Sequence, residues 1–238
     1  NSISREVIAN IDSYLDRAAA DPEVIAVILT GTGRAFCAGA DLTFLNDVPE
    51  ELHPAESARF IRTATDVMRK MELLPKPVIA AVNGIATAGG MELVLCCDLV
   101  IAAESARLGD GHANYGLLPG AGASARLPRK IGATRAKYLF FTGDLLPAKR
   151  MEQAGLVNDV VPDGTLIEHV EALLAKLANK SPLGLRRMKQ LADDSLEFTL
   201  DQALNYEQQI NEYYMVSYDR KEGVTAFNEK RKPVFLGR

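Results

Sequence analysis

Residues 31–42 read Gly-Thr-Gly-Arg-Ala-Phe-Cys-Ala-Gly-Ala-Asp-Leu. The apolar run 24–29 precedes them, and a continuous run of this kind predicts a buried β-strand. A strand that ends in a turn of small residues places bare backbone N–H groups at the end of a sheet. Such groups can hold a phosphate or stabilise an oxyanion. Neither the P-loop pattern nor G-x-G-x-x-G is present, which argues against the phosphate alternative.

A second turn of this kind, Asn-Gly-Ile-Ala-Thr-Ala-Gly-Gly-Met-Glu at 83–92, follows another apolar strand about 50 residues later. The pair of turns resembles the crotonase (enoyl-CoA hydratase/isomerase) superfamily. Further segments match it in order and spacing: Pro75–Gly84, Cys97–Ala102, Gly116–Gly122, Ala154–Val157 and Ala226–Pro233. Each segment alone is a weak motif, but together they extend the resemblance over essentially the whole chain.

The resemblance implies an α/β fold with a crotonase-like spiral of ββα units. We expect residues 1–180 to form this core, which would bind acyl-CoA and carry the catalysis, and residues 181–238 to form a helical trimerisation region. Apolar periodicity independently predicts helices near 4–19 and 55–74. Two strands precede the Asn1 segment in the superfamily pattern, and we expect them to be missing from the chain as given.

The composition suits one large domain, with 238 residues and 47% hydrophobic residues. The net charge of −4 argues against a nucleic-acid-binding surface. No apolar run reaches the length of about 18 residues that indicates a membrane span, and no signal peptide is recognisable. Three cysteines without a disulfide or metal-ligand spacing favour a reducing, cytoplasmic setting and no metal site.

An oxyanion hole is the chemical centre that the resemblance implies, and its donors would be the backbone N–H groups of Ala40 and Gly89. Two convergent N–H groups stabilise the charge that develops on a thioester carbonyl oxygen, and losing one such donor typically costs about 3–4 kcal/mol of barrier. Gly89 is also expected to begin a helix, whose dipole favours an enolate oxygen. The alternative is that these glycines only form turns.

Glu92 and His112 are the candidate catalytic pair. Glu92 lies three residues after Gly89, at the end of the first turn of the expected helix, and matches one of the two glutamates of the superfamily's hydratases. The second glutamate is replaced here by His112. An imidazole can still transfer protons near neutral pH. The alternative leaves Glu92 as the only base and makes His112 a polar pocket residue.

The resemblance also implies the residues that bind substrate. The Ala38 carbonyl would meet the adenine of coenzyme A. Further residues that would line the substrate channel are Asp41, Leu42, Gly90, Gly111, Leu117 and Gly120. Coenzyme A would enter as part of the substrate, and no separate cofactor is expected.

The sequence therefore predicts an acyl-CoA enzyme, most simply one that hydrates a 2-enoyl-CoA reversibly. Isomerisation of an enoyl-CoA and C–C hydrolysis of a CoA-linked ketone stay open because of His112. A non-catalytic acyl-CoA-binding scaffold is the alternative from another class. A homotrimer or a dimer of trimers is the assembly that the resemblance implies.

Overall fold

The computed structural model describes residues 1–238, and its strands form two four-stranded sheets. The first sheet has the order β1 (Val27–Thr30), β3 (Val78–Val82), β5 (Leu99–Ala103), β8 (Asp159–Val161), and all its pairs are parallel. The second has the order β2 (Ala35–Cys37), β4 (Ile85–Thr87), β6 (Arg107–Gly109), β7 (Leu146–Pro147), with only the last pair antiparallel. From β1 to β6, successive strands therefore alternate between the two sheets, as a spiral of ββα units requires.

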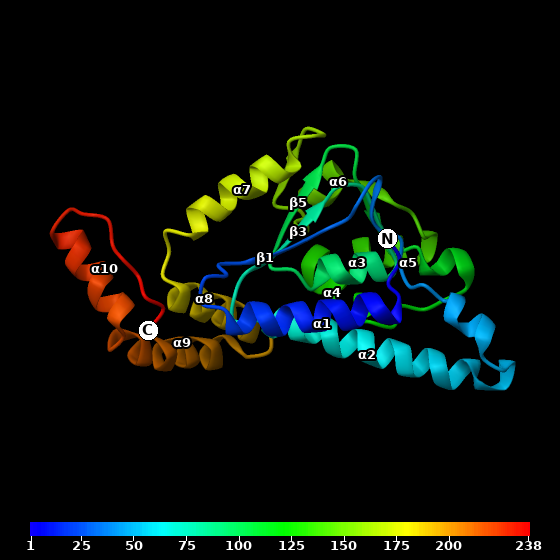
Figure 1. The fold of residues 1–238 in the computed structure, drawn as a ribbon, viewed down its shortest axis with the longest axis horizontal. Coiled ribbons are helices and arrows are strands. Elements are labelled where there is room, and N and C mark those ends of the chain that lie inside the picture. Colours follow the sequence, from blue (N-terminus) through cyan, green and yellow to red (C-terminus); the bar gives the residue numbers. More distant parts are fainter.

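Helices lie around the strands, and Figure 1 shows them on more than one side of β3 and β5. Those of the first 180 residues are α1 (Arg5–Ala20), α2 (His53–Leu73), α3 (Gly89–Leu95), α4 (Ala123–Ile131), α5 (Ala133–Thr142), α6 (Ala148–Gln153) and α7 (Leu166–Leu177). Short 3-10 turns are η1 (Thr43–Asp47), η2 (Glu50–Leu52) and η3 (His112–Tyr115). The predicted helices near 4–19 and 55–74 are confirmed as α1 and α2. The α/β fold class is confirmed as well.

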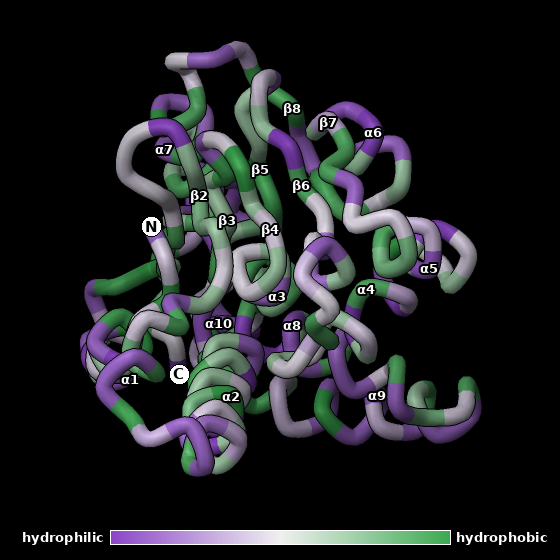
Figure 2. Tube along the Cα trace, turned by 90° about the vertical axis from the view of Figure 1, so that its right-hand side faces the viewer, coloured by the Kyte–Doolittle hydropathy of each residue, from purple (hydrophilic) through white to green (hydrophobic).

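The hydrophobic core lies around the central strands. All five residues of β3 are fully buried, as are all seven of α3. The hydropathy colouring of Figure 2 shows hydrophobic residues along β3 and β5 and hydrophilic residues on the outer turns. Because α3 is packed against its neighbours along its whole length, a polar side chain on it is held in a fixed place.

The prediction of a buried strand over 24–29 is wrong in its extent and in its burial. The strand is only Val27–Thr30, and residues Ile25 and Ile28 are 42% and 39% exposed. The reason is that β1 lies at the edge of its sheet, where its residues alternate between partly buried and exposed. An apolar run alone does not distinguish an edge strand from a central one.

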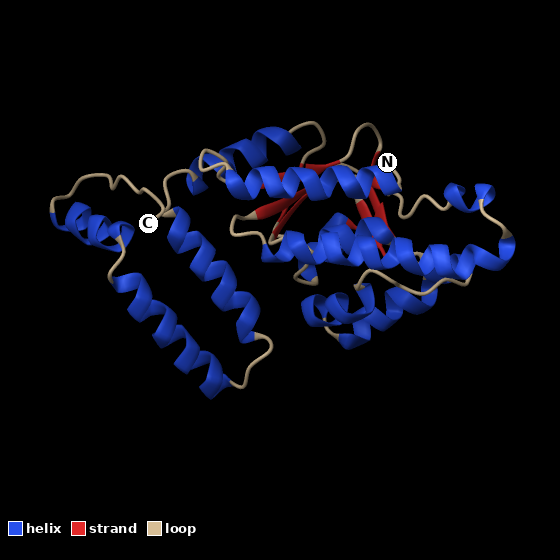
Figure 3. Cartoon of the chain, turned by 60° about the horizontal axis from the view of Figure 1, so that its bottom comes forward, coloured by secondary structure: helices blue, strands red, loops and turns tan.

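Three further helices form the C-terminal region: α8 (Pro182–Ser195), α9 (Leu200–Met215) and α10 (Tyr218–Asn228). Figure 3 shows this region reaching away from the strands. Its caps are well formed, since the Thr199 hydroxyl and the Gln202 side chain make a reciprocal capping box at the start of α9. No residue of α9 is buried, and Leu200 and Tyr213 are both 75% exposed.

Candidate active site

Ala40 and Gly89, the two predicted oxyanion donors, lie side by side. A Cβ atom placed on Gly89 would be 3.4 Å from the Ala40 nitrogen and 3.0 Å from Cδ1 of Ile3. The neighbouring Gly39 has a φ of +102°, and a Cβ there would be 3.5 Å from the Gly89 nitrogen. Glycine at 39 and 89 therefore allows the two backbone segments to approach each other closely.

Both N–H groups are free to bind a ligand. The strand-like segment 38–41 pairs with the first residues of the chain through the N–H groups of Ala38 and Asp41 and the carbonyl of Gly39. The Ala40 N–H donates to no backbone carbonyl in this pairing. Gly89 is the first residue of α3, and the first bond along the helix runs from the Glu92 N–H to the Ala88 carbonyl, 3.1 Å away. The Gly89 N–H consequently has no acceptor within the helix.

A strained residue sets the start of α3. Ala88 has φ +50° and ψ −120°, a conformation that residues with a side chain rarely adopt. Its N–H donates to the Asp110 carbonyl at 2.6 Å. On the other side, Gly90 packs so tightly that a Cβ would lie 2.2 Å from the Cys37 carbonyl oxygen. The first turn of α3 is thus fixed by β2 and by the Asp110 segment together.

Glu92 is the buried carboxylate of the site, with only 3% of the residue exposed. Its Oε1 accepts two hydrogen bonds, from the N–H groups of Ala121 at 2.8 Å and Ala123 at 3.0 Å. No protein group donates a hydrogen bond to its Oε2. Among the fully buried side-chain nitrogen and oxygen atoms, only Asp110 Oδ2 has no hydrogen-bond partner, so Glu92 Oε2 is not fully buried. Glu92 Oε2 therefore reaches accessible space, where a water molecule can bind to it.

Burial raises the pKa of Glu92, and the charge of Asp110 adds to this effect. The N–H bonds from Ala123 and Ala121 and the nearby His112 oppose the rise only in part. A carboxylate of this kind is a stronger base than an exposed glutamate. It is thus suited to take a proton from water near neutral pH.

His112 stands at the start of η3, between two left-handed glycines, Gly111 and Gly116. Its Nδ1 lies 2.9 Å from Asp110 Oδ1, which also accepts the His112 N–H at 3.2 Å. Asp110 is 1% exposed. This contact makes Nδ1 the proton-bearing nitrogen and leaves Nε2 as the atom that can exchange a proton elsewhere.

Burial would lower the pKa of His112, but the hydrogen bond and charge of Asp110 and the charge of Glu92 outweigh it and raise this pKa. The two candidate residues thus act on each other electrostatically, so the structure brings Glu92 and His112 into one site. Together with the Ala40 and Gly89 N–H groups, they place two N–H donors, a carboxylate and an imidazole around one centre, which are the groups that an oxyanion hole and a general acid–base pair require.

The remaining predicted site residues lie around this centre in different environments. Ala38, Leu42, Leu117 and Gly120 are exposed at its surface. Gly111 is buried, and a Cβ on it would be 2.3 Å from the Thr87 hydroxyl. The side chain of Asp41 is bound locally, since its Oδ1 accepts from the Thr43 N–H and hydroxyl at 3.0 and 2.7 Å.

Several residues of the site were not predictable from the motifs. Three polar residues lie close to His112 in the sequence, Asp110, Asn114 and Tyr115, and only Asp110 forms a hydrogen bond with the ring. Asn114 instead donates to the Gly143 carbonyl at 3.0 Å, and Tyr115 is 83% exposed. The donors to Glu92 carry no sequence signal, because a backbone N–H belongs to any residue. Only the glycines that flank Ala121, at 120 and 122, indicate a close backbone approach.

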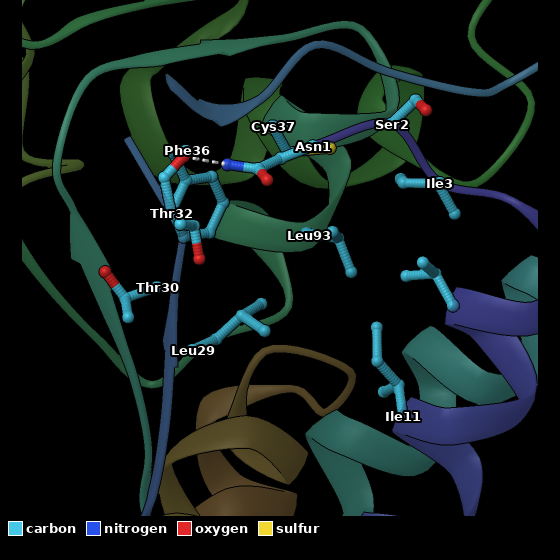
Figure 4. A pocket seen from close by; sticks show the side chains of 12 residues that line it. Asn1, Ser2, Ile3, Ile11, Leu29, Thr30, Thr32, Phe36, Cys37 and Leu93 are labelled. Atoms are coloured by element: carbon cyan, nitrogen blue, oxygen red, sulfur yellow. Dashed lines mark hydrogen bonds between the residues drawn. The ribbon is translucent and has the colours of Figure 1, made fainter. Parts of the chain in front are cut away.

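A cavity of about 190 Å³ lies close to the site but is separate from it (Figure 4). It is lined by the first residues of the chain, α1, β1, β2 and Leu93 of α3, and none of the four candidate catalytic groups borders it. Ile3 stands between this cavity and Gly89. No three His, Cys, Asp or Glu side chains gather in a way that could hold a metal ion, and no helix has the length and apolar character needed to cross a membrane.

Known proteins resemble this chain over its whole length. The pattern of the enoyl-CoA hydratase/isomerase family matches residues 1–238. A crotonyl-CoA hydratase of Syntrophomonas wolfei is 36% identical, with 100% of this chain and 90% of that protein covered. A 2,3-dehydroadipyl-CoA hydratase of Escherichia coli is 37% identical, with 100% and 91% covered.

Solved structures agree with the sequences. An enoyl-CoA hydratase from Bacillus anthracis superposes with a TM-score of 0.93 at 39% identity, covering 100% of this chain and 91% of that one. An enoyl-CoA hydratase from Mycobacterium smegmatis gives 0.91 at 33% identity, covering 98% and 90%. The fold, the two small-residue turns and these matches have one explanation. The chain belongs to the enoyl-CoA hydratase/isomerase family of the crotonase superfamily.

Proposed function

We propose that this enzyme catalyses the reversible hydration of a 2-enoyl-CoA. The observation that carries the proposal is the Glu92 carboxylate, held through one oxygen by two N–H groups while its second oxygen is open to water. It lies on the same short helix as the free N–H of Gly89, so base and oxyanion donor are fixed relative to each other. Hydratase names among the relatives support this choice over isomerisation.

The reaction then follows from the positions of these groups. The thioester carbonyl oxygen accepts from the N–H groups of Ala40 and Gly89, which stabilises the enolate that forms. Glu92 takes one proton from water as the water oxygen bonds to Cβ. His112 is protonated at Nε2 because Asp110 stabilises the imidazolium, and it gives this proton to Cα. Transfer of the proton from Glu92 to His112 restores both groups.

Substrate recognition in this proposal uses the surface around the site. The Ala38 carbonyl accepts from the adenine amino group, and Leu42 and Leu117 line the acyl-CoA channel. Gly90, Gly111 and Gly120 shape that channel by having no side chain. Asp41 shapes it indirectly, since its carboxylate holds the turn that begins at Thr43. Coenzyme A arrives as part of the substrate, so no separate cofactor is needed.

We also propose that residues 181–238 act as the trimerisation region and residues 1–180 as the catalytic core. Support comes from the large exposed apolar side chains of this region, among them Leu200, Tyr213 and Phe227, the last 82% exposed. Burying them between subunits would be favourable. Sedimentation equilibrium would show a mass of three or six chains, whereas a monomer at micromolar concentration would contradict the proposal. The buried free thiols fit a reducing, cytoplasmic setting.

The direct test follows the loss of conjugated-enoyl absorbance when the protein meets a short 2-enoyl-CoA. We expect rapid loss with the wild type and a fall in turnover of about 10²–10⁴-fold for Glu92→Gln, the range of general acid–base contributions. His169 is a matched control for histidine substitutions, because it is exposed and pairs with Asp159 at 3.2 Å. His112→Gln should lower turnover and His169→Gln should not. An inert wild type on linear, branched and cyclic enoyl-CoAs would refute hydration and favour isomerisation.

A further inference from the structure

A partly buried ion pair connects helix α2 to the loop that holds Glu92. Arg126, on the first turns of α4, donates through Nε to Glu72 Oε1 at 2.6 Å and through Nη2 to Glu72 Oε2 at 2.9 Å. The two side chains are 16% and 18% exposed. This paired geometry is the strong arrangement that a guanidinium and a carboxylate can form.

The same guanidinium also holds the loop. Its third donor, Nη1, lies 2.7 Å from the Ala121 carbonyl oxygen. The N–H of that same residue is one of the two donors to Glu92 Oε1, and the other comes from Ala123 two residues later. The contacts therefore run without a gap from Glu72 through Arg126 and residues 121–123 to Glu92.

Gly122 makes this arrangement possible. It has φ +112°, and a Cβ atom placed on it would lie only 1.8 Å from Arg126 Nη1. Any other residue at 122 would be strained and would displace the guanidinium from the Ala121 carbonyl. The chain thus leaves room for Arg126 at the point where it contacts the loop.

We propose that Arg126, anchored by Glu72, is a positioning residue that aims the Ala121 and Ala123 N–H groups at Glu92. Its role is to fix Oε1 of the carboxylate so that Oε2 meets the water molecule. The kinetic consequences of this inference rest on the proposed function. The placement of the two backbone amides does not, and it can be measured without substrate.

Arg126→Met removes all three donors and keeps a long side chain. We expect hydrogen exchange of the Ala121 and Ala123 amides, followed by NMR, to accelerate at least about tenfold, because both amides lose their fixed acceptor. The pH at which their chemical shifts report the titration of Glu92 should rise, since the lost N–H bonds favour the ionised form. Turnover should fall about 10²-fold, the typical effect of a small misplacement, with KM little changed.

Two variants separate positioning from general stabilisation of the helices. Arg126→Lys keeps the positive charge but cannot bond both Glu72 oxygens and the Ala121 carbonyl in the same geometry. It should fold normally and give smaller changes in amide exchange, titration and turnover. Arg129→Met on the same helix removes an exposed guanidinium that lies 3.7 Å from Glu197. It should change neither the hydrogen exchange of the two amides nor turnover. One outcome would overturn the proposal: Arg126→Met lowers the melting temperature, while hydrogen exchange of both amides and the pH dependence of their chemical shifts stay as in the wild type.

A double-mutant cycle completes the test. If Arg126 acts through Glu92, then Arg126→Met should cause no further loss of turnover in a Glu92→Gln background. Losses that add in full would contradict the proposed route. An inert wild type would refute the proposed hydration alone, because the amide exchange and titration would still decide whether Arg126 positions the loop.

Discussion

Glu92 and His112 are held in two contrasting ways. Glu92 belongs to a helix of which every residue is buried, and backbone N–H groups bind its carboxylate. His112 begins a 3-10 turn with no buried residue, and a single side chain, Asp110, binds its ring. Glu92, the proposed base, is therefore held within the core by the backbone, whereas His112, the proposed acid, is held by the carboxylate of a single residue.

This difference indicates where each half of the site is vulnerable. The Glu92 half depends on close packing and exact backbone placement, which no single side chain supplies. The His112 half depends on one charge and one hydrogen bond. Substitutions in the first half should affect stability and geometry, while those in the second should shift the pH dependence. The following experiments test this contrast in order of decreasing effect.

Gly90→Ala should give the largest effect, because its Cβ would lie 2.2 Å from the Cys37 carbonyl oxygen. Backbone atoms cannot move aside cheaply, so we expect a loss of about 3 kcal/mol or more in the free energy of unfolding. Gly223→Ala is the control, since a Cβ in that helix would meet only Phe235 at an ordinary 3.7 Å. Denaturant unfolding measures both, and equal stabilities would show that α3 is not fixed by packing against β2.

Glu92→Asp tests whether placement matters beyond charge. Aspartate keeps the carboxylate but is shorter by one methylene, so it cannot keep both bonds from Ala121 and Ala123 and still reach the same water. We expect turnover to fall about 10²-fold. Glu168→Asp, in the first turn of α7, is the exposed control. Near-normal turnover in Glu92→Asp would mean that the backbone donors do not set the geometry.

Asp110→Asn tests the His112 half. The pKa of His112 is raised, so the imidazolium persists above its ordinary value of 6.5 and the basic limb of the turnover profile should lie higher. Glu92 must be ionised, and its raised pKa places the acidic limb above 4.5. Asparagine keeps a hydrogen-bond acceptor but removes the charge, so the basic limb should move down by about one pH unit.

The groups that face His112 are Asp110 from its own loop and Glu92 from α3. Asp159→Asn is a matched control, because Asp159 forms a similar but exposed pair with His169. Its pH profile should equal that of the wild type. If the basic limb stays in place in Asp110→Asn, a group other than His112 supplies the proton.

The same contrast explains how far the sequence could predict the site. The family and the fold class follow from motifs and their spacing, and helices α1 and α2 follow from apolar periodicity. The residue pairs Ala40/Gly89 and Glu92/His112 are implied by the family resemblance, and their catalytic roles stay predictions. The partners of these residues do not. Ala121 and Ala123 act through backbone atoms, which have no residue type to recognise, and Glu72 and Arg126 meet from helices 54 residues apart in the sequence. Burial of the run at 24–29 was mispredicted because edge position depends on topology.

Ala88→Gly should give the smallest effect and the finest test. Relief of strain at φ +50°, ψ −120° should stabilise the protein by about 1–3 kcal/mol, offset by about 0.5–1 kcal/mol of glycine chain entropy. The melting temperature should therefore rise by a few degrees. Turnover should fall a few-fold, because the Gly89 N–H is then aimed by a more flexible residue. Lys230→Gly replaces the other non-glycine residue with positive φ, at an exposed position, and should leave turnover unchanged. A stabilised Ala88→Gly enzyme with full turnover would show that packing against Cys37 and Asp110 alone directs the oxyanion donor.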